Sequence, residues 1–416
     1  DGCRDAAGGA GPCEVFDARE VLNQRAADRT MYYVEDGKKD DFKKTNSDLS
    51  ADVLGLPTTG DLPDLTPALV DNEYRVSGTV LGDASDPAIR LLYRDQLIDL
   101  ITAKAGTRRQ KERLGAIWHS TPVLQTNLSS IEVQIPSFIE YKKLVATRPT
   151  VAYTMTHDGQ IHAFLLSQPG AGTPTGSKWL EEIWSLTPQA LMKRLQELGT
   201  KLQVLADGRM VLKDVRLERA TSTATAVNEA KTWHSVLVAP YRQGARGLIA
   251  LDVTNPYKPK VRWEITNQRR CWMTDDASEA TSCETFDEDD RSDYRNLGFI
   301  HAKPQIGTVF IQDGLIRKEV AAAFFPCGEP VSGEPESGKC FMVVRLDNGE
   351  KIKEFRNGNT SVVDANTATD NVIDTLDHAI VGDPVAYNTF LGTFVTRLFV
   401  GDAGGQLWRV DVSAPD

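Results

Sequence analysis

The chain is predicted to be all-β: a β-propeller of about seven blades, some of them irregular, with helical inserts and a mixed N-terminal segment. Two recurring patterns predict this fold. Short β-rich runs repeatedly flank a turn of Asp, Asn or Gly, and a short segment with proline precedes several apolar runs. Imperfectly repeated hairpins with recurring turn and proline residues, spread over roughly 300 residues, are typical of radially repeated four-stranded blades.

The clearest hairpin joins VAYTMTH (151–157) to QIHAFLL (160–166) across Asp158-Gly159. A two-residue turn of matching twist needs positive φ, which glycine tolerates and aspartate can approach. The same arrangement of strand, turn and strand returns downstream in GLIALDVTNP (247–256), CFMVVRLDNGEKIKEF (340–355) and RLFVGDAGGQLWRVDV (397–412). The companion segments with proline are HSTPVL (119–124), HAKPQIGTVFI (301–311) and GDPVAYNTFLG (382–392).

The N-terminal part follows a different pattern. Residues 1–28 are predicted to be a partly helical N-terminal segment, and residues 29–416 the propeller domain, which opens with a strand in RTMYYVEDG (29–37). Residues 86–104 have apolar positions at helical spacing behind Asp86, so we expect an amphipathic helix there. A helical insert is expected at about 177–205, where Pro188 divides a strand or linker from a helix.

Composition limits the function classes. The chain has 416 residues and a net charge of -11, and no clustered basic face stands out. We therefore expect no nucleic-acid partner. No apolar run approaches the ~18 residues that span a bilayer, so we expect no transmembrane segment. The sequence opens on Asp1 without a charged and then apolar leader, as expected for a mature or excised piece.

The six cysteines fall into three close pairs: Cys3 with Cys13, Cys271 with Cys283, and Cys327 with Cys340. We predict local disulfides, although six cysteines allow 15 connectivities. A bridge over a loop of this size stabilises by about 3 kcal/mol. Free thiols and zinc are the competing interpretations, and for zinc the C-x(2-4)-C spacing and a nearby histidine are both missing. Disulfides imply an oxidising compartment.

Five segments occur in a characteristic order: LGAIWHSTPVL (114–124), RPTVAYTMTHDGQIHAF (148–164), Trp184 to Pro188, WHSVLVAPYRQGARGLIALDVTNP (233–256) and FVGDAGGQLWRVDV (399–412). Together they resemble the C-terminal β-propeller domain of PilY-type proteins, large accessory proteins of bacterial type IV pilus assembly. The similarity runs from about residue 29 to residue 412.

The resemblance implies a non-enzymatic pilus biogenesis factor and pilus-tip adhesin of a Gram-negative bacterium. Such a protein is exported to the periplasm, the outer-membrane surface or the pilus tip. Its implied partners are minor pilins of the tip complex, and host or abiotic surfaces. The implied roles are pilus assembly, twitching motility and surface attachment.

PilY-type propellers commonly carry a calcium loop of the D-x-D-x-D-G-x-x-D kind just before the final hairpin. That hairpin is present here as FVGDAGGQLW (399–408), but the preceding AYNTFLGTFVT (386–396) contains no carboxylate. Calcium prefers six to eight oxygen ligands, several of them charged. The usual calcium site is therefore expected to be lost or to have moved.

Two acidic loops are the alternative calcium sites, DEDDRSD (287–293) and the better candidate DANTATDNVID (364–374). The second loop offers four oxygen ligands: Asp364, Asn366, Asp370 and Asp374. It lacks an EF-hand glycine and a bidentate glutamate at position twelve. A solvated acidic loop is the simpler interpretation of both segments.

Catalytic motifs are sparse among the six histidines: His119, His157, His162, His234, His301 and His378. Three of them, His119, His234 and His301, stand beside similar S-x-P, S-V or K-P segments. Equivalent positions of a radially repeated fold converge on its axis, so a histidine cluster or a metal there is one interpretation. The simpler one is that they hydrogen-bond turns between strands. In WHST and WHSV, neighbouring residues point to opposite faces of a strand and cannot form a serine–histidine relay.

The alternative function is that of a quinoprotein-like propeller dehydrogenase. Enzymes that bind pyrroloquinoline quinone also use propellers, with D-x-x-T-G-x-x-x-W repeats, and RLDNGEKIKEF (345–355) is similar to such a repeat with Phe355 near the tryptophan position. Those enzymes often place a disulfide between adjacent cysteines, which this sequence does not contain. We therefore expect an assembly module without catalytic residues, and no cofactor other than the calcium considered above.

Overall fold

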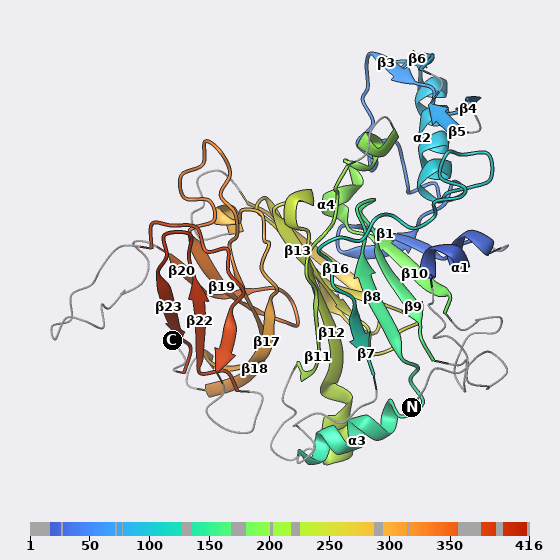
Figure 1. Cartoon of the computed structure of the whole chain (residues 1–416). Helices are drawn as coiled ribbons and strands as arrows, with labels where there is room; N and C mark the ends of the chain where they lie inside the picture. The colour runs from blue at the N-terminus through green and yellow to red at the C-terminus, as the bar shows by residue number, and fades with distance from the viewer. Residues whose placement is uncertain are drawn as a thin grey trace, which may run out of the picture.

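The computed structural model describes residues 17–25, 28–70, 73–76, 78–126, 135–167, 180–199, 203–217, 225–286, 294–313, 316–356, 376–387 and 394–413. Within these ranges the chain is mostly β, as predicted. Four sheets of three to six strands lie beside one another in chain order, and a smaller unit with helix α2 stands at one end (Figure 1).

The first sheet has the strand order β2-β1-β10-β9-β8-β7. In that order its strands are Lys38–Asp41, Met31–Glu35, Glu182–Thr187, Ile161–Leu165, Val151–Met155 and Val123–Gln125. The second sheet runs from β11 to β16 in sequence order. Its strands are Val211–Arg216, Trp233–Pro240, Gly247–Asp252, Lys260–Thr266, Arg269–Asp275 and Ala280–Thr285.

The third and fourth sheets are simpler antiparallel meanders. The third contains β17 (Gln305–Asp313), β18 (Ile316–Pro326), β19 (Cys340–Arg345) and β20 (Lys351–Arg356). The fourth contains β21 (Val385–Tyr387), β22 (Arg397–Gly401) and β23 (Leu407–Asp411). The hairpins predicted from residues 151–166, 340–355 and 397–412 are all confirmed, as β8–β9, β19–β20 and β22–β23.

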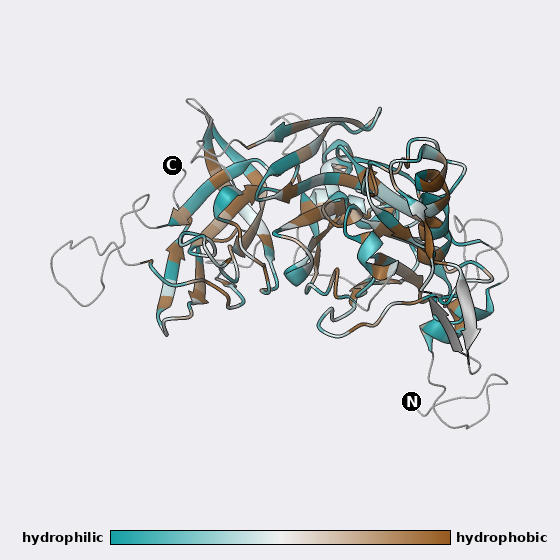
Figure 2. Cartoon of the chain, turned by 90° about the horizontal axis from the view of Figure 1, so that it is seen from above, coloured by the Kyte–Doolittle hydropathy of each residue, from teal (hydrophilic) through white to brown (hydrophobic). Residues whose placement is uncertain are grey.

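Consecutive sheets pack face to face through separate apolar cores. Tyr153 of the first sheet shares a core with Leu237 of the second, and Trp263 of the second shares one with Phe325 of the third. Phe324 points the other way along β18 and packs with the fourth sheet, because successive side chains of a strand alternate between its faces. Figure 2 shows this apolar content along the strands. The described residues form an open series of four sheets, and they show neither ring closure nor a count of seven blades.

The N-terminal part builds a small unit around α2 (Pro87–Ile101). The side chain of Asp86 accepts a hydrogen bond from the N–H of Ala88, which confirms the predicted helix and its cap. Two ribbons flank it, β3 (Asp61–Pro63) with β6 (Val80–Asp83), and β4 (Pro67–Val70) with β5 (Glu73–Val76). Helix α1 (Ala18–Gln24) lies in the segment predicted to be partly helical. None of the helices in the described ranges is long and apolar enough to cross a membrane.

In the insert expected at about 177–205, the described residues have a strand before Pro188 and short helical turns after it. The strand is β10, which pairs in parallel with β1 and lies inside the first sheet. The helical remainder is short, α4 (Gln189–Met192) and a 3₁₀ turn at Leu195–Gly199. Glu264 of the second sheet accepts the N–H groups of Gln189 and Ala190 at 3.1 and 2.8 Å. The segment is therefore a structural part of the sheet and not a detachable decoration.

The other helices are short connections. Helix α3 (Pro136–Leu144) packs on the second sheet beside α5 (Ala226–Glu229) and the 3₁₀ turn at Ala230–Thr232. Two more 3₁₀ turns occur at Arg242–Gly244 and Tyr294–Asn296. Helix α3 covers the beginning of β12, where Phe138, Tyr141 and Trp233 form a small buried aromatic cluster.

Two of the three expected disulfides lie in the described residues. Cys271 is bonded to Cys283 across the paired strands β15 and β16. Cys327 is bonded to Cys340, and both are completely buried. Both bridges have the local pairing that the spacing favoured. Cys3 and Cys13 lie outside the described residues.

Removing the Cys327–Cys340 bridge with the double substitution Cys327→Ala/Cys340→Ala is expected to lower the free energy of unfolding by about 3 kcal/mol. The bridge closes a loop with a sequence separation of 13, so its loss frees the unfolded chain more than the folded one. Urea denaturation of the oxidised proteins measures the difference. Equal unfolding midpoints for the variant and the wild type would contradict the prediction.

Candidate functional site

The chain segments that enter β7 and β11 come together in a polar cluster. We call β7, β11, β17 and β21 the innermost strands of their sheets. We define this inner cluster as Trp118, His119, His157, Asp207 and Arg242. The backbone N–H of His119 donates to Oδ1 of Asp207 at 2.8 Å, and its Nδ1 contacts Oδ2 of the same carboxylate. Arg242 Nη1 donates to that Oδ2 at 3.1 Å. The cluster thus ties the entry to β7 to the entry to β11 and to the β12–β13 turn.

The acid at the centre of the inner cluster is charged. Burial raises the pKa of Asp207, but the hydrogen bonds and the charge of His119 outweigh it, so the pKa is below its ordinary value. Arg242 has φ of 55°, a left-handed conformation that a non-glycine residue adopts only when its surroundings require it. Trp118 stacks on His119 with ring centroids 5.2 Å apart and is 76% exposed.

A second ion pair joins the segment that enters the second sheet to the segment that enters the fourth. Arg209, just before β11, donates to both oxygens of Asp383, just before β21, at 2.7 and 2.5 Å. Asp383 also accepts the N–H of Lys303, at the entry to β17. His301 lies beside it with Nε2 3.0 Å from Glu329. Burial and the nearby Arg242 lower the pKa of His301, although Glu329 opposes them.

The prediction that His119, His234 and His301 occupy equivalent places is therefore right for two of the three. His119 and His301 lie at the entries to β7 and β17, close enough to influence each other electrostatically. His234 lies instead on β12, the second strand of its sheet. The described ranges contain no group of three or more His, Cys, Asp or Glu side chains arranged to hold a metal ion.

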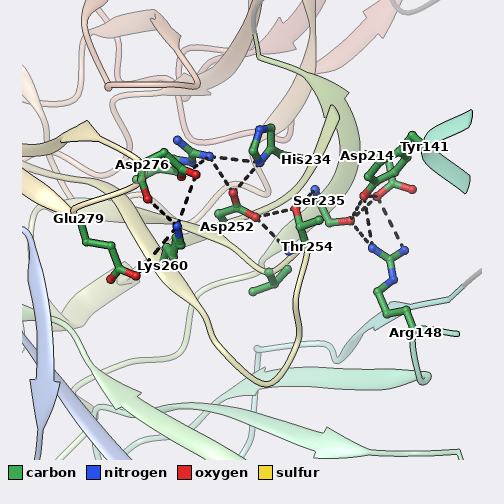
Figure 3. A network of polar contacts seen from close by, with 12 residues as sticks. Tyr141, Arg148, Asp214, His234, Ser235, Asp252, Thr254, Lys260, Asp276 and Glu279 are labelled. Atoms are coloured by element: carbon green, nitrogen blue, oxygen red, sulfur yellow. Dashed lines mark hydrogen bonds and ion pairs between the residues drawn. The ribbon is translucent and has the colours of Figure 1, made fainter. Parts of the chain in front are cut away.

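His234 lines a separate cavity that we call the lateral groove. It has a volume of about 540 Å³ and lies between α3, the start of β12 and the connection from β13 to β14. Its apolar wall includes Leu144, Val145 and Trp233. Figure 3 shows the polar network beside the groove, whose members that line the cavity are Tyr141, Arg148, His234, Asp252, Thr254, Lys260 and Asp276.

Asp252 organises one half of the polar base. Its Oδ2 accepts from His234 Nδ1 at 2.6 Å and from Arg262 Nη2 at 2.7 Å (Figure 3). Arg262 also reaches Asp276 at 3.2 Å, and Asp276 pairs with Lys260 at 3.4 Å. Burial raises the pKa of Asp252, but His234, Arg262 and hydrogen bonds hold it well below its ordinary value.

Ser235 organises the other half. Its hydroxyl contacts Asp214, accepts from Arg148 Nη1 at 2.6 Å and lies 2.9 Å from the Tyr141 hydroxyl (Figure 3). Burial and Asp214 raise the pKa of Tyr141 to about 12. Ser235 and His234 therefore engage different carboxylates, as expected for neighbours on a strand, and do not form a nucleophile–base pair.

Acid is expected to destabilise the protein partly through Asp252. Its pKa in the folded state lies below the unfolded value near ~3.9. As pH falls, the unfolded state therefore takes up the proton first, and the stabilisation present above that value is lost. Urea denaturation between pH 5 and the acid limit of folding should show a smaller pH dependence for Asp252→Asn than for wild type. An identical dependence in both proteins would contradict this role.

Comparison with known proteins gives the chain its relatives. No family model matches it. It is 32% identical over 126 residues to a protein of Xylella fastidiosa (strain Temecula1), named as a homologue of the type IV pilus biogenesis factor PilY1, covering 29% of this chain and 8% of that protein. It is 28% identical over 184 residues to PilY1 of Pseudomonas aeruginosa (strain UCBPP-PA14), covering 41% of this chain and 14% of that protein.

The chain is related to PilY1 proteins. The predicted PilY-type resemblance is thereby confirmed, while the aligned segments span only 8% to 14% of these two relatives' own lengths. The crystal structure of the Pseudomonas aeruginosa PilY1 C-terminal domain aligns with 68% of this chain and 44% of that chain, with a TM-score of 0.41 and 19% sequence identity.

Asp402 organises the turn of the hairpin at 399–408. Asp402 accepts the N–H groups of Gly404 and Gln406 at 2.9 Å each, and the indole N–H of Trp408 at 2.8 Å. This aspartate therefore stabilises the turn itself. The candidate calcium ligands Asp364, Asn366, Asp370 and Asp374 lie outside the described residues, as does the segment 287–293.

Sequence reasoning missed the partners of the histidines. Asp207, Arg242 and Asp252 carry no motif, and each meets its histidine only because the sheets fold together. One signal was available for Asp207. It stands in ADGRM, shortly before β11. The corresponding segments before β7, β17 and β21 contain HSTP, HAKP and Gly-Asp-Pro.

Proposed function

We propose that this chain is a non-enzymatic module of a type IV pilus biogenesis factor. It is proposed to act at the pilus tip with minor pilins, in pilus assembly, twitching motility and surface attachment. The observation that carries the proposal is the sequence relationship to PilY1 proteins. An exported location, in the periplasm or at the outer membrane or pilus tip, agrees with the two disulfides.

The finer architecture belongs to the same proposal. The second, third and fourth sheets begin with their innermost strands, and consecutive sheets pack on each other, an arrangement that supports propeller blades. We propose that further sheets complete a ring of about seven blades. Calcium held by Asp364, Asn366, Asp370 and Asp374 also remains a proposal. Native mass spectrometry before and after chelation tests it through the mass of one bound ion.

The dehydrogenase alternative gains no support from the segment that raised it. Residues 345–355 form the turn and second strand of the β19–β20 hairpin. The backbone carbonyl of Leu346 in that turn accepts the indole N–H of Trp263 at 3.0 Å. The repeat therefore serves to join the second and third sheets.

Deletion of the encoding gene in its own bacterium tests the proposed function. We expect fewer surface pili by electron microscopy and reduced twitching, both restored by the wild-type gene. Purified minor pilins should also be retained by the immobilised, oxidised protein. Unchanged piliation together with no retention of minor pilins would contradict the proposal.

A further inference from the structure

We propose that the lateral groove binds an extended acidic peptide segment of a partner protein. This is a binding activity of the isolated chain, so it can be tested without pili and can fail independently of the proposed function. Four observations carry it: the charge of the groove, the free lysines at its edge, its apolar wall and its fixed base.

The groove is locally cationic in an acidic protein. The whole chain has a net charge of -11. Among the groove's lining residues, however, the side chains that are cationic at neutral pH outnumber the carboxylates: Arg148, Lys231, Lys258 and Lys260 against Asp252 and Asp276. A cationic recess with low-dielectric walls attracts anionic partners. Charge complementarity therefore selects an acidic occupant.

Two of these cations are available to a ligand. Lys231 and Lys258 are exposed, and within the described ranges neither side chain makes a hydrogen bond or ion pair. The positive field also reaches Lys39 of the first sheet. Burial is the main reason that the pKa of Lys39 is lowered, and Lys258 and Lys260 lower it further against the opposing effect of Glu279 and Asp41.

The wall of the groove suits a peptide better than a free anion. Leu144 is 62% exposed, and Val145 and Trp233 lie behind it with 8% and 3% exposure. Peptide grooves combine such apolar contacts with polar groups at the edge. The volume of about 540 Å³ lies within the usual range of ligand sites, roughly 300–1,000 Å³.

The base of the groove is held by its own contacts. Asp252 is shared by His234 and Arg262, and Arg148 is held by Ser235. These groups are engaged within the fold, so carboxylates of a ligand are expected to meet Lys231 and Lys258 first. Because those lysines are exposed, reversing their charge leaves the fold intact and isolates the binding role.

The test is fluorescence anisotropy with a short fluorescein-labelled peptide of alternating glutamate and leucine. The double variant Lys231→Glu/Lys258→Glu should bind the peptide about tenfold more weakly than wild type. The matched control Lys111→Glu/Lys193→Glu changes the net charge equally at exposed sites outside the groove's lining. It should stay within about twofold of wild type. Thermal unfolding checks that all three proteins are folded.

A second variant separates a peptide from a simple anion. Leu144→Ser removes an exposed apolar contact without changing the charge of the groove, so it should also weaken the peptide while leaving any binding of inorganic phosphate unchanged. Equal peptide affinity in wild type and the double lysine variant would overturn the proposal. So would full competition by phosphate with no effect of Leu144→Ser, which would assign the groove to a small anion. Self-association that is lost in the lysine variant would assign it instead to a second copy of the chain.

Discussion

Replacing Glu182 with alanine is expected to lower the free energy of unfolding by about 3–5 kcal/mol, the largest effect of any polar substitution in the first sheet. The Glu182 side chain is completely buried, and it accepts two hydrogen bonds from Arg29, from Nε and Nη2, at 2.8 Å each. His162 Nδ1 approaches the same carboxylate at 2.6 Å. Alanine would leave the buried guanidinium of Arg29 without its main counter-charge. An unpaired buried charge lowers the free energy of unfolding more than replacing both partners by apolar residues would.

The electrostatics of the site support a charged carboxylate. Burial raises the pKa of Glu182, but the charge and hydrogen bonds of Arg29 and His162 outweigh it and hold the pKa far below its ordinary value. Glu182→Gln should therefore also be destabilising, because the amide keeps one acceptor but not the charge. The free energy of unfolding of Glu182→Gln should lie between those of the wild type and Glu182→Ala.

Urea denaturation at neutral pH measures these differences. The matched control is Glu140→Ala on α3, where Glu140 pairs with Lys143 at 2.7 Å and the lysine side chain is 67% exposed. An exposed pair of this kind contributes about 0.2–1 kcal/mol. If Glu182→Ala cost no more than Glu140→Ala, Glu182 would not be the structural anchor of the first sheet.

The elements that could be predicted from the sequence are those with a local physical cause. Asp158-Gly159 produces the β8–β9 hairpin because Gly159 takes φ of +85°. Asp86 begins α2 because its side chain satisfies a free N–H of the first turn. The short segments with proline were recognised as recurring, and three of the four innermost strands follow one of them.

The elements that could not be predicted depend on distant partners. The sequence leaves residues 182–187 open as a strand or a linker, and their pairing with β1 on one side and β9 on the other makes them a strand. Arg29 and Glu182 are 153 positions apart, so no local pattern links them. The segments beside His119 and His234 look alike in the sequence, although WHSV begins β12 and WHST precedes β7.

Two tryptophans link neighbouring sheets. Each lies on the fourth strand of its sheet, counted from β7 in the first sheet and from β11 in the second. Trp184 of β10 donates its indole N–H to the carbonyl of Pro256 in the second sheet at 2.7 Å. Trp263 of β14 does the same toward Leu346 in the third sheet at 3.0 Å. The fourth strand of the third sheet carries Phe355, which packs against the core shared with the fourth sheet but has no donor.

Trp263→Ala is accordingly expected to cost about 3–5 kcal/mol, because the indole is completely buried between the second and third sheets. Trp263→Phe separates the two contributions. It retains much of the apolar contact but leaves the Leu346 carbonyl without its donor, at a cost of about 1–3 kcal/mol. Trp118→Ala is the control, since Trp118 is 76% exposed, and its cost should stay within about 0.5 kcal/mol.

Urea denaturation of the three variants decides between a packing role and a linking role for Trp263. If Trp263→Phe were as stable as wild type, the hydrogen bond to Leu346 would contribute nothing, and Phe355 would serve the third sheet as well as tryptophan serves the second. If it lost more than 1 kcal/mol while keeping a single cooperative transition, the indole N–H would be needed to hold the sheets in register. The recurring turns at 252–256 and 346–349 would then be explained, since each presents a carbonyl to the tryptophan of the preceding sheet.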